Sequence, residues 1–225
     1  MKTLIVSASR HNASKIKRTK IVESLACFPP GDFELALTSS NRDGLSSLYN
    51  SYITDDIANE FDCLLYIHDD VYIDDLKCFD KIQEQFNNNI DVVGLAGASG
   101  VTLERPALWH LMSDRKTWSG AVSHPAGEGT NQVTSFGPTP KRCVIMDGLF
   151  LACKPSSLIH NNVRFDEQFT FHHYDIDFCL SCNKNNLKMS TCNINVIHQS
   201  PGLLNSESEL FKQSEQKFVD KYVKN

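Results

Sequence analysis

The sequence predicts an α/β fold with a mostly parallel central sheet and helices on both faces. Apolar, strand-like runs alternate with amphipathic, helix-like stretches through residues 1–96, and this alternation is typical of parallel sheets. The run 63–67 is apolar without interruption, as expected of a strand covered on both faces. A chain of 225 residues fits one α/β domain, so we expect a single domain over residues 1–225.

The elements of the first half follow in order from this alternation. A helix over residues 15–28 places Ile21, Leu25 and Phe28 on one face and ends at Pro29. Ligands of parallel sheets bind beyond the carboxyl ends of the strands. The turns after the first and third strands are therefore the places where we expect a site. The predicted strands are 4–6, 33–37, 63–67 and 91–96, and the other predicted helices are 45–57 and 75–86.

The second half is less regular. Residues 97–142 show neither the apolar alternation of a strand nor the apolar spacing of a helix, and they contain both tryptophans, Trp109 and Trp118. We expect an ordered but partly mobile loop that forms a wall over the site, because long loops inside compact domains are usually functional. After it we predict strands at 143–153 and 188–197, and helices at 174–185 and 207–223.

Composition excludes some classes of partner. The net charge is −5 without a basic run, which argues against nucleic acid but permits one small phosphorylated ligand. No apolar run approaches the roughly 20 residues of a membrane span, and we expect the first residues to form a strand and not a signal peptide. The eight cysteines lie mostly in apolar segments, so we expect reduced thiols and a cytoplasmic location.

The strongest chemical pattern is His68-Asp69-Asp70, directly after the apolar run 63–67. Carboxylates at the carboxyl end of a parallel strand are suited to hold Mg²⁺ or Mn²⁺ together with phosphate oxygens. The alternative is that one acid caps the next helix. Asp74 and Asp75 already stand at that helix start and are the better caps.

Two further patterns lie in the last third of the chain. Asp175 and Asp177 fall at the start of a predicted helix, where aspartate is favoured by capping alone but where one carboxylate can also serve as a general base. His198 follows a predicted strand in a polar turn. It is either an ordinary surface histidine or a third metal ligand.

Taken together, these pieces resemble the family-two glycosyltransferases of the GT-A type, which use nucleotide-diphosphate sugars. The resemblance covers about residues 2–202 and is carried by the acidic pair, the segment Phe165-Asp166-Glu167, the helix start at 174–178 and the strand that ends at His198. The chain is also similar to a group of small bacterial glycosyltransferase-like proteins with a His68-Asp69-Asp70-Val71 core.

The resemblance implies a nucleotide-binding half (1–96), an acceptor and catalytic half (97–202) and a C-terminal helix (203–225). It implies a metal-dependent, inverting transfer of a sugar to a glycan or lipid-linked acceptor in polysaccharide biosynthesis, in the cytoplasm or at the inner face of the membrane. The implied site residues are Asp175 as catalytic base; Asp70 and His198 for Mn²⁺ or Mg²⁺; Ser7, Ser9, Arg10, Asn50, His68 and Asp69 for the nucleotide-sugar; and Trp118, Asp147, Gly148, Tyr174 and Asp177 for the acceptor.

The sequence departs from the family pattern at named positions. His68 stands where an aspartate is usual, Tyr174 stands where a glutamate is usual, and no aspartate follows the second strand to select the nucleobase. Two alternatives stay open. A sugar nucleotidyltransferase would use the same sheet and acids, but Ser7-Ala8-Ser9-Arg10 lacks the glycines of its phosphate loop. The second alternative is a non-catalytic module that binds a nucleotide-sugar.

Overall fold

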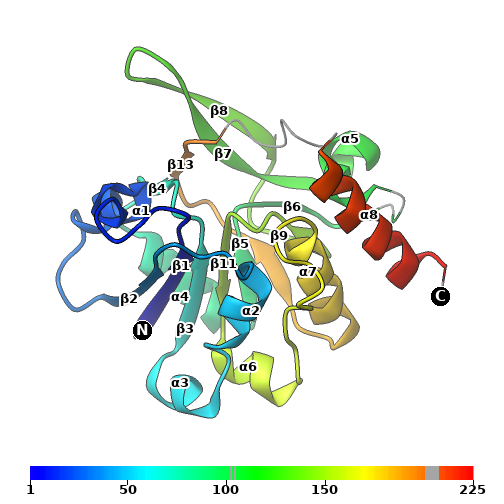
Figure 1. Cartoon of the computed structure of the whole chain (residues 1–225), viewed down its shortest axis with the longest axis horizontal. Coiled ribbons are helices and arrows are strands. Elements are labelled where there is room, and N and C mark those ends of the chain that lie inside the picture. Colours follow the sequence, from blue (N-terminus) through cyan, green and yellow to red (C-terminus); the bar gives the residue numbers. More distant parts are fainter. Residues whose placement is uncertain (102, 104, 201–207, 225) are drawn as a thin grey trace.

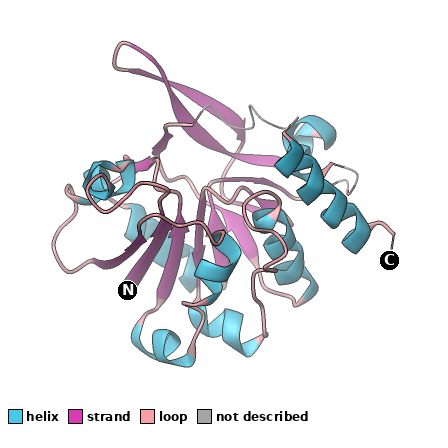
Figure 2. Cartoon of the chain, in the orientation of Figure 1, coloured by secondary structure: helices cyan, strands magenta, loops and turns pink. Residues whose placement is uncertain are grey.

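The computed structural model describes residues 1–101, 103, 105–200 and 208–224, which form two sheets with helices around them (Figures 1 and 2). In this described part, the larger sheet has seven strands in the order β2-β1-β3-β11-β5-β12-β9. Five of them run in one direction, and β11 and β9 run against them. The prediction of a mostly parallel central sheet is confirmed. The strands are β1 (Thr3–Ala8), β2 (Phe33–Thr38), β3 (Cys63–Ile67), β5 (Val92–Gly94), β9 (Lys141–Cys143), β11 (Phe150–Cys153) and β12 (Met189–Thr191).

A smaller sheet lies beside the first, with the order β10-β6-β7-β13-β4 and with β8 paired to β7. Most of it comes from the region that we expected to be a loop, so the prediction for 97–142 is wrong in this respect. β7 and β8 form a long antiparallel hairpin that projects from the body (Figure 1). Most residues of β8 are exposed, so its sequence carries no apolar alternation by which it could be predicted. The strands are β4 (Val71–Ile73), β6 (Ala96–Ala98), β7 (Trp118–Gly127), β8 (Thr130–Gly137), β10 (Ile145–Met146) and β13 (Val196–His198).

The chain passes from the larger to the smaller sheet four times, from β3 to β4, from β5 to β6, from β9 to β10 and from β12 to β13. For this reason the strands predicted at 91–96 and 188–197 are each divided in two. The strand predicted at 143–153 is divided among three strands, because β9 ends at Cys143 and because Asp147 and Gly148 separate β10 from β11. The four crossings and this break create a junction between the sheets.

The helices cover both faces of the larger sheet, with α2 in front of it and α4 behind it in Figure 1. The helix predicted at 15–28 is broken at Thr19, whose backbone is extended. The helix predicted at 45–57 is also broken, and the Thr54 side chain accepts a hydrogen bond from the Ile57 amide to start a new helix. The helix α6 was not predicted. The helices are α1 (Lys20–Leu25), α2 (Leu45–Asn50), α3 (Asp55–Glu60), α4 (Cys78–Asn87), α5 (Trp109–Met112), α6 (Pro155–His160), α7 (Tyr174–Lys184) and α8 (Glu209–Tyr222), with short 3-10 turns at Ile16–Arg18, Pro106–Leu108 and Arg115–Thr117.

A cluster of aromatic rings packs around the start of α7. The rings of Tyr49, Tyr66, Phe165, Tyr174 and Phe178 are all buried and lie in mutual contact. The closest pair is Phe165 and Phe178, whose stacked rings have centroids 4.1 Å apart. Packed aromatic rings have few alternative positions, so the first residues of α7 are held rigidly.

The helix α8 packs against the segment that precedes α7. Phe211 and Phe218 are fully buried, and Lys221 Nζ lies 2.6 Å from Asp177 Oδ1 and 2.7 Å from Asp166 Oδ2. Because Asp177 is buried, this ion pair ties α8 to α7. None of the helices within the described residues is long and apolar enough to cross a membrane. All eight cysteines are free thiols.

Candidate active site

The site lies at the junction of the two sheets, where sequence-distant turns meet. His68, Asp69 and Asp70 form the turn between β3 and β4. His198 ends β13, which pairs antiparallel with β4 so that His198 lies opposite Val71. This register brings the imidazole of His198 beside the carboxylate of Asp70. The expectation that the turn after the third strand belongs to a site agrees with this geometry.

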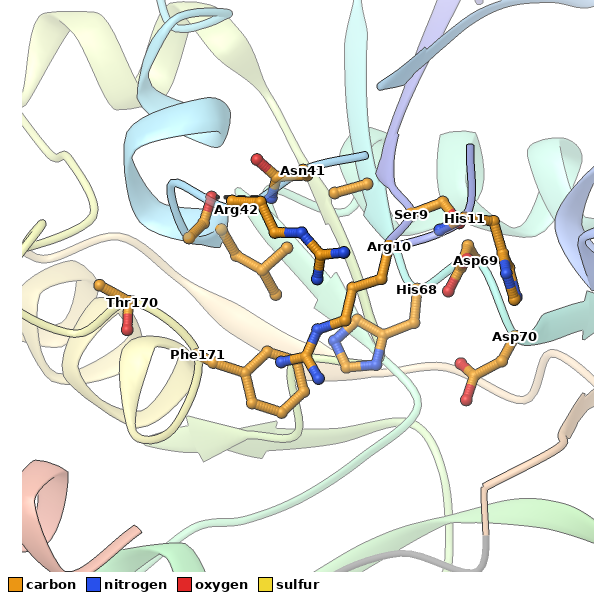
Figure 3. Close-up of a pocket in the computed structure, with 13 residues that line it drawn as sticks. Ser9, Arg10, His11, Asn41, Arg42, His68, Asp69, Asp70, Thr170 and Phe171 are labelled. Carbon is orange, nitrogen blue, oxygen red and sulfur yellow. Dashed lines mark hydrogen bonds between the residues drawn. The ribbon is translucent and has the colours of Figure 1, made fainter. Parts of the chain in front are cut away.

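A cavity of about 610 Å³ opens at this turn and at the turn after β1. Figure 3 shows polar side chains from several loops directed into it. Its size is within the range of small-molecule sites. The lining residues are Ala8, Ser9, Arg10, His11, Asn41, Arg42, Gly44, Leu45, His68, Asp69, Asp70, Thr170 and Phe171.

Three side chains at the edge of this cavity form a candidate metal centre. One potential ligand atom from each of His68, Asp70 and His198 lies within 4.8 Å of the others. His198 Nε2 is 3.4 Å from Asp70 Oδ1. Two imidazoles and a carboxylate are a donor set that fits a divalent transition-metal ion.

The three groups of this candidate centre shift from their ordinary pKa values through burial and through their contacts with one another. Burial acts to raise the pKa of Asp70, but its contacts with His198 and His68 outweigh burial and hold the pKa below its ordinary value. For His198, burial acts to lower the pKa, and the hydrogen bond and charge of Asp70 outweigh it and raise the pKa. Burial lowers the pKa of His68. Asp70 is thus ionised and His68 neutral at neutral pH, which are the forms that bind a metal ion, whereas a metal ion at His198 would displace the proton that Asp70 favours there.

A second set of contacts connects this centre to Asp175. The hydroxyl of Tyr174 lies 2.9 Å from His68 Nε2 and donates a hydrogen bond of 2.9 Å to the Gly148 carbonyl. The Gly148 amide in turn donates a 2.8 Å hydrogen bond to Asp175 Oδ2. Burial, together with the negative charge of Asp147, raises the pKa of Asp175 to about 7. A carboxyl group with such a pKa is suited to accept a proton near neutral pH.

The opposite wall of the cavity carries positive charge. The Arg10 guanidinium lies 5.5 Å from the ring centroid of Phe171. The Phe171 ring stacks on His68 with centroids 6.2 Å apart. Arg42 reaches into the same space from the loop before α2 (Figure 3). The charges of the two arginines offset those of Asp69 and Asp70, so a bound divalent cation would leave the cavity positive and able to hold an anionic ligand.

The β7–β8 hairpin lies next to the metal centre. Its residue Ser123 pairs with Ile197 on β13, and the rings of His124 and His198 have centroids 5.6 Å apart. His124 Nδ1 is 2.8 Å from the Ser200 carbonyl oxygen. The region predicted as a wall over the site therefore does border it, although as a hairpin rather than a loop.

Four of the six predicted nucleotide-binding residues line the cavity, and two do not. Ser9, Arg10, His68 and Asp69 line the cavity, whereas Ser7 is fully buried and Asn50 does not line it. The side chain of Asn50 is engaged with the Phe165 backbone, donating to its carbonyl at 2.8 Å and accepting from its amide at 2.9 Å. Asn50 thus positions the segment before α7, and a direct contact of Asn50 with nucleotide stays a prediction.

Three of the five predicted acceptor residues lie around Asp175, and the other two have structural contacts elsewhere. Asp147, Gly148 and Tyr174 lie around Asp175. Trp118 packs edge-on against Trp109, and its indole N–H donates to Ser113 Oγ at 2.8 Å, which anchors the start of β7. Asp177 is 1% exposed and paired with Lys221, so it holds α8 instead of facing solvent.

Several cavity residues were missed by the sequence prediction, among them Asn41, Arg42, Thr170 and Phe171. Arg42 and Asn41 follow the predicted second strand, so the strand-end rule could have found them. Thr170 and Phe171 lie in a loop with no such signal. They reach the cavity because the Leu45 amide donates a 2.7 Å hydrogen bond to the Thr170 carbonyl, which docks this loop on α2.

Solved structures share this fold. The chain is similar to S. aureus TarS in complex with UDP-GlcNAc, with a TM-score of 0.59 and 13% identity over 98% of this chain and 66% of that one. It is also similar to GalNAc-T7 with UDP, GalNAc and Mn²⁺, with a TM-score of 0.58 and 11% identity over 98% of this chain and 47% of that one. A197 from STIV gives a TM-score of 0.52 at 16% identity, over 85% of this chain and 81% of that chain. The chain thus spans about half the length of the GalNAc-T7 structure.

The fold is the GT-A fold of glycosyltransferases. The chain belongs to the glycosyltransferase-like family, whose model matches residues 27–222. No curated protein matches the sequence. The resemblance on which the sequence prediction rested is therefore confirmed at the level of family, fold and enzyme class.

Proposed function

We propose that this glycosyltransferase transfers a sugar from a nucleoside diphosphate donor to an acceptor hydroxyl with inversion, that it needs a divalent metal ion, and that Asp175 is its catalytic base. One observation carries the proposal. A partly buried carboxyl group, that of Asp175, has a pKa raised to about 7 and is hydrogen-bonded to Gly148, which is itself linked through Tyr174 to the candidate metal ligand His68.

His68, Asp70 and His198 would hold the metal ion. When bound, the ion would neutralise the negative charge that develops on the departing diphosphate. Imidazole nitrogen suits transition metals, whereas Mg²⁺ prefers oxygen ligands. We therefore expect Mn²⁺ to bind more tightly than Mg²⁺, in agreement with the Mn²⁺ named in the GalNAc-T7 structure.

The donor would bind in the 610 Å³ cavity. TarS, which shares the fold, was solved with UDP-GlcNAc, and this supports a nucleoside diphosphate sugar as the donor here. Arg10 and Arg42 supply charged donors for phosphate or for a base edge, and Phe171 offers an exposed ring for stacking.

Asp175 would act on the acceptor. Oδ2 accepts the Gly148 hydrogen bond, so Oδ1 is the oxygen that would take the acceptor hydroxyl proton. As this proton leaves, the acceptor oxygen forms a bond to the anomeric carbon, and the bond from that carbon to the diphosphate oxygen breaks on the opposite side. The bonding electrons leave with the nucleoside diphosphate. We place the acceptor, a glycan or lipid-linked saccharide, on the side of Asp147 and the β7–β8 hairpin, with the reaction in the cytoplasm.

A thermal-shift experiment tests donor and metal together. A ligand at about 100 times its dissociation constant adds about 2.7 kcal/mol of stability, which for a chain of this length raises the melting temperature by roughly 5–10 °C. We expect this shift with at least one nucleoside diphosphate sugar in the presence of Mn²⁺. Asp70→Asn should abolish it, because the variant removes the one anionic ligand of the centre.

Asp175→Asn separates binding from catalysis. The variant should keep the Mn²⁺-dependent shift and lose sugar transfer, measured as release of nucleoside diphosphate. Asp80→Asn, on the exposed side of α4, is the control with the same change of net charge. Retained transfer in Asp175→Asn would remove this residue as base. Metal-dependent binding by the wild type without turnover of any donor would indicate a non-catalytic binding module.

A further inference from the structure

The hydroxyl of Tyr174 has a position that the proposed chemistry does not explain. Tyr174 is 3% exposed, so its hydroxyl is not available to an acceptor in solvent. It lies 2.9 Å from His68 Nε2 and 2.9 Å from the Gly148 carbonyl oxygen. It therefore joins a candidate metal ligand to the residue that holds Asp175.

The direction of these two hydrogen bonds follows from proton counting. A tyrosine hydroxyl has one proton, and a backbone carbonyl can only accept. The Tyr174 proton must therefore go to Gly148, and the Tyr174 oxygen must accept from His68. Nε2 of His68 then carries the proton, and the lone pair of the neutral ring lies on Nδ1.

We propose that Tyr174 is a positioning residue that fixes His68 in the Nε2–H tautomer and so makes Nδ1 its metal-binding nitrogen. This inference rests on the metal site of the proposed function. Metal-bound histidines generally donate their second N–H to a nearby acceptor, which sets the ring orientation and strengthens the metal bond. Here the acceptor is the Tyr174 hydroxyl, which passes its own proton to the Gly148 carbonyl.

The surroundings hold the Tyr174 hydroxyl in place. Its ring belongs to the aromatic cluster with Tyr49 and Phe165. At position 148 an added Cβ would collide with the Tyr174 hydroxyl and would come within 2.7 Å of the Asp175 Cβ. Glycine at 148 is therefore what permits the hydrogen bond. Gly148 meets Tyr174 through its carbonyl and Asp175 through its amide, so the same residue orders both sides of the centre.

The tautomer can be read directly in the metal-free protein. In two-bond ¹⁵N–¹H correlation spectra, the two nitrogens of a neutral imidazole differ strongly in chemical shift, and the signals of His68 can be assigned by their loss in His68→Gln. We expect His68 in the Nε2–H form. The Nδ1–H form in the wild-type protein would overturn the proposal, whatever the variants do.

Metal affinity provides the second measurement. Tyr174→Phe should weaken Mn²⁺ binding by roughly 10- to 100-fold, the usual effect of removing such a partner, as measured by titration calorimetry. The matched control is Tyr66→Phe. It also removes a buried hydroxyl that donates to a backbone carbonyl, that of Tyr49 at 3.3 Å, and it leaves the hydrogen bond between Tyr174 and His68 in place. We expect this control to keep wild-type affinity.

The results of these measurements distinguish a failure of the role proposed for Tyr174 from a failure of the proposed function. Equal affinities of Tyr174→Phe and Tyr66→Phe would show that the hydroxyl does not support the metal ligand, and would overturn the proposal. If the wild type binds no Mn²⁺, the proposed metal site fails and this inference fails with it. If metal binds as expected but no donor is turned over, the function fails and the role of Tyr174 stands.

Discussion

Removal of the Asp147 charge provides a direct test of how Asp175 is tuned. Asp175 Oδ2 accepts the Gly148 amide hydrogen bond at 2.8 Å, and the negative charge of Asp147, the residue before Gly148, is second to burial among the causes that raise the pKa of Asp175. Two charges about 7 Å apart at an effective dielectric constant of about 20 repel by about 2 kcal/mol. This energy corresponds to a pKa change of about 1.5. Asp147→Asn should therefore lower the pKa of Asp175 from about 7 to between roughly 5 and 6.

The measurement needs no substrate. The carboxyl ¹³C signals of labelled aspartates are followed against pH, and Asp175 is assigned by the loss of its signal in Asp175→Asn. Asp80→Asn removes the same charge from an exposed position on α4 and should leave the titration of Asp175 within a few tenths of a pH unit. Once a donor is known, transfer should rise with pH through about 7, because the base must be ionised. In Asp147→Asn this rise should move to lower pH.

Two results would refute this reasoning. If Asp175 titrates at the same pH in the wild type and in Asp147→Asn, repulsion by Asp147 does not raise its pKa. If the wild-type residue titrates near 4, burial does not raise the pKa either, and Asp175 loses the property that marks it as a base in the neutral range.

Two further predictions concern the framework of the site. Lys221→Met leaves the buried carboxylate of Asp177 without its cation and should destabilise the protein by about 3 kcal/mol in urea unfolding. Lys224→Met breaks an exposed pair and should cost less than about 1 kcal/mol, and equal costs would contradict the argument. Gly44→Ala meets both a positive φ of 93° and a Cβ contact of 2.8 Å with Thr170, so it should destabilise more than Gly31→Ala, which has a φ of 100° but no contact within 4 Å. An equal loss in both variants would show that the docking of the Thr170 loop on α2 contributes nothing.

The sequence could predict the turn after β3 because its signal is local. A continuous apolar strand of a parallel sheet must be covered on both faces, and the polar residues that follow it emerge at the ligand-binding edge. His68, Asp69 and Asp70 were found in this way. Asp175 and His198 were local patterns with strong structural alternatives, and the family resemblance alone selected them.

Other parts of the site depend on contacts that no local pattern contains. Phe171 lines the cavity because the loop before α7 is held by α2 on one side and by α8 on the other. The β7–β8 hairpin was missed for a different reason. Most of β8 faces solvent on both sides, so hydrophobic burial imposed no alternation on its sequence, and backbone pairing with β7 forms the strand.

The structure also connects two departures from the family pattern that the sequence shows separately. The resemblance implies that His68 stands where an aspartate is usual and Tyr174 where a glutamate is usual, and the structure joins these two side chains by a hydrogen bond of 2.9 Å. An aspartate at 68 would give the metal an anionic ligand that needs no N–H acceptor behind it. An imidazole at the same place does need one, and the Tyr174 hydroxyl supplies it without adding a charge beside Asp147 and Asp175. The two side chains therefore act as one unit, and His68→Asp alone should leave the Tyr174 hydroxyl without its donor.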